Sequence, residues 1–232
     1  MNKVFAVGVG PGSSKYVTDV VKDVISQCDV VIGYGYTIKT IEEYVKGKRI
    51  LEVTMQNQED AYQEIADEGN HTILVPFTGD VNFSESEVVD RLIEIYDEVE
   101  IISGISSTQV AASRAKVPTD KSKVITMHIS TSIEEKKLEV VKALIDGYSV
   151  ILVPRPWPKV PEKHFMQSEI AKYLKEKGFD TSKMKVHVYE SITTENETNF
   201  EGTVDQLEGK EFSDLSVMVF NQVTLESYIN FE

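Results

Sequence analysis

A short glycine-rich turn near the start of the chain constrains the fold most. An apolar run, Val4–Val7, is typical of a buried strand, and it leads into Val7-Gly8-Val9-Gly10-Pro11-Gly12. Glycine lets the backbone approach a ligand closely and adopt φ values that other residues avoid. Because a helical pattern follows, the stretch is typical of the strand, turn and helix that begin a nucleotide-type pocket. The same residues also fit a tight Gly-Pro turn without a ligand.

The spacing of these glycines does not match the dinucleotide pattern G-x-G-x-x-G. Ser13 stands where the third glycine is needed, and Pro11 has no N–H for a phosphate. The next expected strand is followed by Tyr34-Gly35-Tyr36, with no acidic residue for a ribose. A nucleotide-dependent oxidoreductase therefore stays only a disfavoured alternative.

Strands and helices alternate along the first half of the chain. Continuous apolar runs predict strands, and apolar residues three and four apart predict helices. The expected strands are 4–7, 29–33, 48–53, 72–77 and 99–102, and the expected helices are 17–28, 38–45, 59–68, 84–97 and 109–116, with Ser84 as an N-cap. Such runs are typical of a parallel sheet covered on both faces. Ligands bind beyond the carboxyl ends of such strands, where three turns fall, at 8–12, 78–83 and 104–108.

The segment Val117–Lys121 interrupts this alternation and predicts a domain boundary at Pro118. The predicted domains are therefore 1–118 and 119–232. The second is also α/β, with strands at 124–128, 149–153, 185–189 and 216–220 and helices at 133–144 and within 164–177. Pro154–Pro161 has too many prolines for a helix or a central strand, which predicts a stiff loop.

Composition excludes several classes of protein and site. The net charge of −14 argues against nucleic-acid binding through a basic face. Cys28 is the only cysteine, and the four histidines have no metal-ligand spacing, so we expect no disulfide framework and no metal site. Neither a secretory signal nor a stretch long enough to span a membrane is evident, which predicts a soluble, cytoplasmic protein.

Four motifs, taken in order, resemble the tetrapyrrole methylase family of S-adenosylmethionine-dependent methyltransferases. They are Gly8–Gly12, Thr78–Asp80, Gly104–Ser107, and Tyr189–Ser191 with Phe200–Thr203. The first is similar to the family's Gly-x-Gly-Pro-Gly signature and the second to its Gly-Asp-Pro loop. The third is similar to the segment after the fifth strand, and the last to late glutamate and Gly-Thr elements. The resemblance covers essentially the whole chain.

The resemblance implies a class III methyltransferase fold, in which two α/β domains hold S-adenosylmethionine in the cleft between them. It also implies a homodimer. The cofactor-binding residues that it implies in the first domain are Pro11, Thr78, Gly79, Asp80, Phe83, Ser106 and Ser107. A looser match adds Pro154 and Ile192 from the second domain.

Within the family, the chain is most similar to members that methylate carbon 5 of precorrin-7 (precorrin-6Y) or its cobalt form in corrin synthesis. The pointers are Gly-Ile-Ser-Ser-Thr-Gln from Gly104 and the pair Met127-His128. Three departures are Val81 in place of proline, Ile129-Ser130 in place of Gly-Arg, and a longer, more basic proline-rich segment. Three alternatives stay open: another tetrapyrrole methylase, a diphthine synthase-like methylase of a modified histidine on a protein, or a sensor without turnover.

Methyl transfer from a sulfonium needs alignment and exclusion of water more than reactive side chains. We therefore expect no nucleophile–base dyad and identify no catalytic residue. Asp80 accepts hydrogen bonds from the cofactor or from a loop N–H, or is an acidic turn residue. Ser106 and Ser107 contact the cofactor, cap a helix, or do both, and Phe83 contacts the cofactor ring or packs. His128 binds substrate or transfers a proton, or is only a strand-end histidine.

The proline-rich segment offers charge partners for an anionic tetrapyrrole. Its basic residues are Arg155, Lys159, Lys163 and His164, which would offset the acidic charge of the chain. The planar guanidinium of Arg155 suits a substrate carboxylate, and Trp157 offers a flat face to a macrocycle. The alternative is a solvated loop whose aromatic side chain packs on its own domain.

Overall fold

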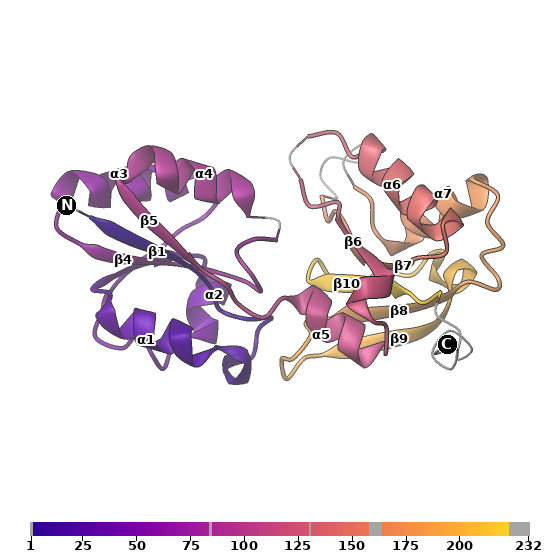
Figure 1. Ribbon diagram of the computed structural model, residues 1–232, viewed down its shortest axis with the longest axis horizontal. Coiled ribbons are helices and arrows are strands. Elements are labelled where there is room, and N and C mark those ends of the chain that lie inside the picture. The colour runs from indigo at the N-terminus through magenta and orange to yellow at the C-terminus, as the bar shows by residue number, and fades with distance from the viewer. Residues whose placement is uncertain (1, 84, 130, 158–163, 223–232) are drawn as a thin grey trace, which may run out of the picture. The chain divides into compact units, whose positions relative to one another are not determined.

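The computed structural model describes residues 2–83, 85–129, 131–157 and 164–222 of the 232-residue chain. The chain divides into two compact units, Met1–Ser107 and Thr108–Glu232 (Figure 1). The division falls at the beginning of helix α5 (Ser107–Arg114), before the boundary predicted at Pro118. Among the described residues, no helix combines the length and the apolar character needed to cross a membrane.

The first unit is built on a five-stranded parallel sheet with the order β3-β2-β4-β1-β5. Its strands are β1 (Lys3–Gly8), β2 (Val30–Gly33), β3 (Arg49–Glu52), β4 (Thr72–Phe77) and β5 (Glu98–Ile102). The parallel sheet predicted from the continuous apolar runs is confirmed. The three inner strands are almost wholly buried, whereas the edge strands β3 and β5 keep exposed residues.

Helices cover both faces of this sheet (Figure 1). Side chains alternate between the faces along each strand, so Val4 and Ala6 belong to one core and Phe5 and Val7 to the other. The helices are α1 (Asp19–Gln27) and α2 (Gly35–Thr40) on one face, and α3 (Gln58–Glu68) and α4 (Ser86–Ile95) on the other. Burial on both faces explains why these strands read as unbroken apolar runs.

The helix predicted at 38–45 was placed wrongly. Helix α2 begins at Gly35 and ends at Thr40, and turns follow it. Ile41 and Val45, whose spacing suggested a helix, are buried from these turns. The predicted N-cap Ser84 lies outside the described residues.

The second unit contains a mixed five-stranded sheet with the order β6-β7-β10-β8-β9. Among the described strands of this sheet, only β6 and β7 pair in parallel. Its elements are β6 (Ser122–Thr126), β7 (Ser149–Val153), β8 (Lys185–Glu190), β9 (Thr198–Thr203), β10 (Ser216–Phe220), and the helices α6 (Glu134–Ile145) and α7 (Gln167–Glu176). Strand β9 was not predicted, because its sequence TNFEGT has a single apolar residue. It is an edge strand held by its backbone pairing to β8.

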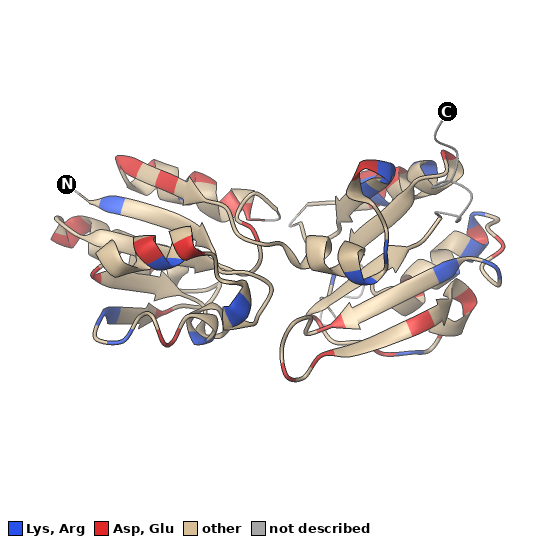
Figure 2. Cartoon of the chain, turned by 60° about the horizontal axis from the view of Figure 1, so that its bottom comes forward, with Lys and Arg blue, Asp and Glu red and all other residues tan. Residues whose placement is uncertain are grey.

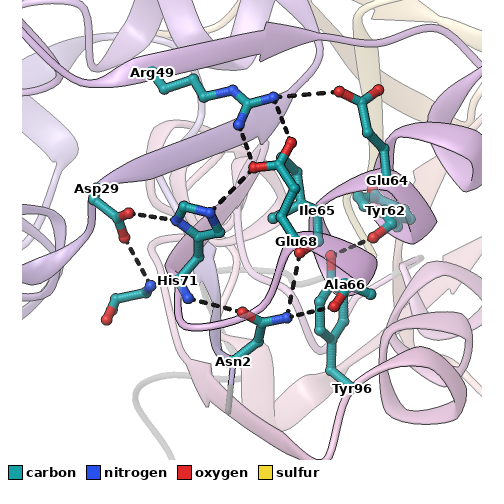
Figure 3. Close-up of polar contacts among 11 residues, drawn as sticks. Asn2, Asp29, Arg49, Tyr62, Glu64, Ile65, Ala66, Glu68, His71 and Tyr96 are labelled. Carbon is teal, nitrogen blue, oxygen red and sulfur yellow. Dashed lines mark hydrogen bonds and ion pairs between the residues drawn. The ribbon is translucent and has the colours of Figure 1, made fainter.

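A polar network ties together the amino-terminal edge of the first sheet (Figure 3). The Asn2 amide donates to the carbonyls of Ile65, at 3.3 Å, and Ala66, at 3.1 Å. The Asn2 side-chain oxygen accepts the His71 N–H at 2.8 Å. One side chain thus joins the beginning of β1 to the last turn of α3 and to the beginning of β4.

Charged side chains extend this network. His71 Nδ1 lies 2.6 Å from Asp29 Oδ2, and His71 Nε2 lies 3.2 Å from Glu68 Oε2. Arg49 then holds Glu68 with a 2.6 Å bond from Nη1 and reaches Glu64 through Nη2 (Figure 3). The network lies at the strand ends opposite to the glycine-rich turns, so its contribution is to stability.

Asn2→Ala is expected to lower the free energy of unfolding by about 1–3 kcal/mol, because the His71 N–H loses its acceptor and the carbonyls of Ile65 and Ala66 lose the Asn2 amide, although Ile65 O keeps the Gly69 N–H. Chemical denaturation of the purified chain measures this change. Asn196→Ala is the matched control, because Asn196 is exposed and a surface substitution costs less than about 0.5 kcal/mol. Equal stability of the two variants would contradict a structural role for the Asn2 side chain.

Candidate functional site

Three loops come together at the carboxyl edge of the first sheet. They follow β1, β4 and β5, which are neighbours in the sheet. Two hydrogen bonds join the first two loops, from Gly79 N–H to Gly10 O at 2.8 Å and from Gly10 N–H to Gly79 O at 3.2 Å. Gly10 and Gly79 both have positive φ values, 84° and 73°, which favour glycine strongly. The turn that dominates the sequence is therefore locked to the Gly-Asp loop by backbone bonds.

Three glycines make this junction possible. A Cβ atom on Gly8 would lie 2.5 Å from Gly79 O and 2.6 Å from Gly104 N. A Cβ atom on Gly104 would overlap the carbonyl oxygens of Gly8 and Gly79. All of these neighbours are backbone atoms, which cannot swing aside as a flexible side chain can. The loops consequently meet as bare backbone, and such a surface can hold a ligand through N–H and C=O groups.

The Asp80 carboxylate joins the second loop to the third. Its Oδ2 accepts the Gly104 N–H at 2.8 Å, and its Oδ1 accepts the Asn82 N–H at 2.9 Å. The Asn82 amide in turn reaches the Ser103 hydroxyl at 3.3 Å. Asp80 therefore accepts hydrogen bonds from loop N–H groups, as one of its predicted roles required. Its contact with the cofactor stays a prediction.

The remaining cofactor residues expected in the first unit lie on the same loops. Ser106 is buried, and its Cα would be 3.6 Å from a Cβ atom on Gly79. Ser107 begins α5, so the positive end of that helix belongs to the third loop. Pro11 is buried beside the Gly10–Gly79 bridge, and Thr78 and Phe83 are half-buried. The structure thus brings these residues to one edge of the sheet, and their contacts with a cofactor stay predictions.

In the second unit, the expected residues follow the parallel strands β6 and β7 and the strand β8, which β10 separates from β7. Pro154 and Arg155 come directly after β7, and His128 comes shortly after β6. Ile192 follows β8 and is buried, as is Pro154. Their contacts with cofactor or substrate stay predictions.

Arg155 packs within its own unit. The guanidinium carbon lies 4.0 Å from the centroid of the Trp157 ring, and Nη1 donates to Thr131 O at 3.1 Å. Its side chain is only 2% exposed, so a substrate carboxylate could pair with it only if its surroundings opened. Lys159 and Lys163 lie outside the described residues, as does Ser130.

His128 lies at the same edge, with its ring 6.1 Å from the Trp157 ring in an edge-on arrangement. His128 is exposed to solvent by surface area, but the protein atoms around its ring still lower its pKa, the positive charge of Arg155 acts in the same direction, and Asp214 opposes them more weakly. The imidazole is therefore neutral near pH 7 and has a nitrogen able to accept a proton.

Sequence reasoning missed a group of side chains after β2. The rings of Tyr34 and Tyr36 stack with their centroids 5.5 Å apart and their planes at 12°. The Tyr34 hydroxyl donates to Gln58 Oε1 at 3.0 Å. The signal was available, because both tyrosines flank Gly35 directly after a strand, at the edge where ligands bind. From the sequence, however, these residues showed only that no acidic residue follows the strand.

Three further features of the described residues bear on other kinds of site, namely the possible metal ligands, the thiol of Cys28 and the distribution of basic charge. The residues described contain no group of three or more His, Cys, Asp or Glu side chains arranged to hold a metal ion. Burial raises the pKa of the Cys28 thiol to about 12, so it is not a thiolate nucleophile. Lys and Arg are scattered among Asp and Glu in both units (Figure 2).

A family model described as Tetrapyrrole (Corrin/Porphyrin) Methylases matches residues 3–208 of the chain. A curated protein of Methanocaldococcus jannaschii, named probable cobalt-precorrin-7 C(5)-methyltransferase, is 27% identical over 222 residues. That alignment covers 94% of this chain and 97% of the relative.

Two solved structures are similar in fold. The methyltransferase CobJ has a TM-score of 0.77 at 16% identity, over 95% of this chain and 94% of its own. The cobalamin biosynthesis precorrin-6Y methylase of Archaeoglobus fulgidus has a TM-score of 0.67 at 21% identity, over 96% and 99% of the two chains. The fold predicted from the four motifs, with two α/β units of the class III type, is therefore confirmed.

Proposed function

Because the chain belongs to the tetrapyrrole (corrin/porphyrin) methylase family and is a methyltransferase, we propose that it methylates a ring carbon of a corrin precursor in cobalamin biosynthesis, with S-adenosylmethionine as the methyl donor. Carbon 5 of precorrin-7 (precorrin-6Y), or of its cobalt form, is the proposed position. The single observation that carries the proposal is the three-loop junction, whose glycines, at Gly8, Gly79 and Gly104, all lie inside the matched range. The likeness of nearly full length to the Methanocaldococcus jannaschii relative supports the position.

The junction suits the polar end of the donor. Backbone N–H and C=O groups can hold a carboxylate or a ribose without large side chains. The beginning of α5 at Ser107 adds the positive end of a helix, which favours a carboxylate. Pro11, Thr78, Asp80, Phe83 and Ser106 complete the proposed donor contacts in the first unit. Pro154 and Ile192, in the second unit, stay predicted contacts.

Methyl transfer from the donor to a ring carbon requires mainly that the two reacting atoms are aligned. When bound, the donor supplies a methyl carbon that its sulfonium has already activated. The chain's residues then hold the ring carbon in line with that methyl group and exclude water. The neutral imidazole of His128 is the proposed acceptor for the proton that leaves the methylated carbon, since it has a free nitrogen near pH 7.

A turnover assay tests this function. The purified chain is incubated with cobalt-precorrin-7 or precorrin-7 and with methyl-labelled S-adenosylmethionine, and the product is analysed by mass spectrometry and NMR. We expect one added methyl group on carbon 5. A label on another carbon, or on a modified histidine of a protein, would overturn the proposed position and support the alternatives.

Calorimetry tests the donor separately. S-adenosylhomocysteine should bind and NAD should release no binding heat, because the glycine spacing and the residues after β2 do not fit a dinucleotide. Binding without turnover on any tetrapyrrole would favour the sensor alternative. From the family resemblance we further propose a homodimer, which gel filtration with light scattering measures. From the composition we propose a cytoplasmic protein without a nucleic-acid partner.

A further inference from the structure

The stacked tyrosines after β2 have an arrangement that packing alone does not require. Tyr34 is anchored, because its hydroxyl bonds to Gln58, whose side chain is only 4% exposed. Tyr36 lies parallel to it and is 56% exposed. An exposed tyrosine ring normally moves among several rotamers, whereas this one is backed by a fixed ring. The two rings thus form a flat aromatic surface. It lies at the carboxyl edge of the first sheet, the same edge that carries the three-loop junction.

Local contacts hold the pair close to that junction. The Thr37 hydroxyl donates to Tyr34 O at 2.8 Å and fixes the first turn of α2. The Thr40 hydroxyl donates to Gly12 O at 3.3 Å, which ties the end of α2 to the glycine-rich turn. At Gly35, between the two tyrosines, an added Cβ atom would lie 2.5 Å from Glu52 Oε1. The two hydroxyl bonds thus constrain the backbone that carries the rings, whereas the Glu52 carboxylate is the end of a flexible side chain and can move aside.

The half-buried carboxyl group of Glu85 acts electrostatically on both tyrosines. Burial raises the pKa of Tyr34, and the charge of Glu85 acts in the same direction, with Arg91 opposing it. Burial also raises the pKa of Glu85 itself to about 7. This group is therefore partly protonated near neutral pH, so it repels an anionic ligand less than an ordinary glutamate does.

We propose that the Tyr34–Tyr36 pair is the surface on which the tetrapyrrole lies, with the exposed face of Tyr36 against the macrocycle. This inference rests on the proposed function and names the substrate contact within it. A tetrapyrrole precursor combines a broad, flat face with many peripheral carboxylates. A preorganised aromatic ring binds such a face at little cost in conformational entropy.

The test uses uroporphyrin, a stable tetrapyrrole polycarboxylate whose absorption and fluorescence report binding. Tyr36→Ala should weaken its binding about two- to tenfold, the usual value of one aromatic contact. Tyr36→Phe should keep the wild-type affinity, because the ring remains. Tyr148→Ala is the control, since Tyr148 is 37% exposed and lies in the second unit. Melting temperatures and S-adenosylhomocysteine affinity should stay unchanged in all three variants.

Unchanged uroporphyrin affinity in Tyr36→Ala, or an equal loss in Tyr148→Ala, would overturn the proposal. A wild-type chain that binds S-adenosylhomocysteine but not uroporphyrin would also overturn it and leave the proposed donor intact. In the opposite case, a Tyr36-dependent affinity for uroporphyrin without any for S-adenosylhomocysteine would support the aromatic surface and count against the proposed donor.

Discussion

Gly104→Ala is expected to destabilise the first unit by at least about 3 kcal/mol, the upper end of the cost of overpacking. The added methyl group would overlap the carbonyl oxygens of Gly8 and Gly79, so relief requires the backbone of two other loops to move. A typical domain is stable by only about 5–15 kcal/mol, so the loss is a large fraction of the total. Because the same loops form the proposed donor site, affinity for S-adenosylhomocysteine should fall below detection. Chemical denaturation and calorimetry measure the two effects.

Gly47→Ala is the control for the added methyl group. Gly47 has no atom within 4 Å of an added Cβ, and its φ of +83° adds only local strain. A left-handed alanine costs about 1–2 kcal/mol, so the variant should fold and should bind the donor normally. If Gly104→Ala proved no less stable than Gly47→Ala, the close packing of the three loops would be contradicted.

Asp80→Ala is expected to lower donor affinity by tenfold or more, about 1.4 kcal/mol, and stability by about 1–3 kcal/mol. The substitution removes the acceptor of the Gly104 and Asn82 N–H groups, so the second and third loops lose the bond that Asp80 makes between them and keep the longer Asn82–Ser103 bond. Loops that must be ordered during binding reduce affinity. Calorimetry with S-adenosylhomocysteine and chemical denaturation on the same samples give both values.

Asp80→Asn separates the two roles of this side chain. It keeps one side-chain oxygen to accept a loop N–H, so part of the lost stability should return. A donor contact that needs the negative charge would remain lost. If Asp80→Ala lowers stability and leaves affinity unchanged, Asp80 is a structural residue only.

The sequence alone determined the layout of the first unit. Continuous apolar runs such as Val4–Val7 and Ile73–Phe77 required burial on both faces, and this requirement led to a parallel sheet. The glycine positions identified the loops that would approach a ligand, because glycine alone tolerates their backbone geometry. These signals are local, so they can be recognised without knowing which segments meet.

Short-range sequence patterns were wrong or gave no signal where contacts between distant segments decide the structure. Strand β9 has little apolar character and exists because β8 offers it a partner. Ile41 and Val45 have helical spacing but reach the core from turns. In both cases tertiary contacts outweigh local preference.

What only the tertiary structure decided is which polar groups satisfy one another. Asp80 and Gly104 are 24 positions apart, and their hydrogen bond depends on β4 and β5 flanking β1. The burial of Arg155 against Trp157 depends on side-chain packing that no spacing rule reports. The stacking of Tyr34 on Tyr36 likewise depends on Gln58, which comes from another helix. Periodicity in the sequence records which residues must leave water, whereas hydrogen bonds and ring contacts form only between groups that the fold has already brought together.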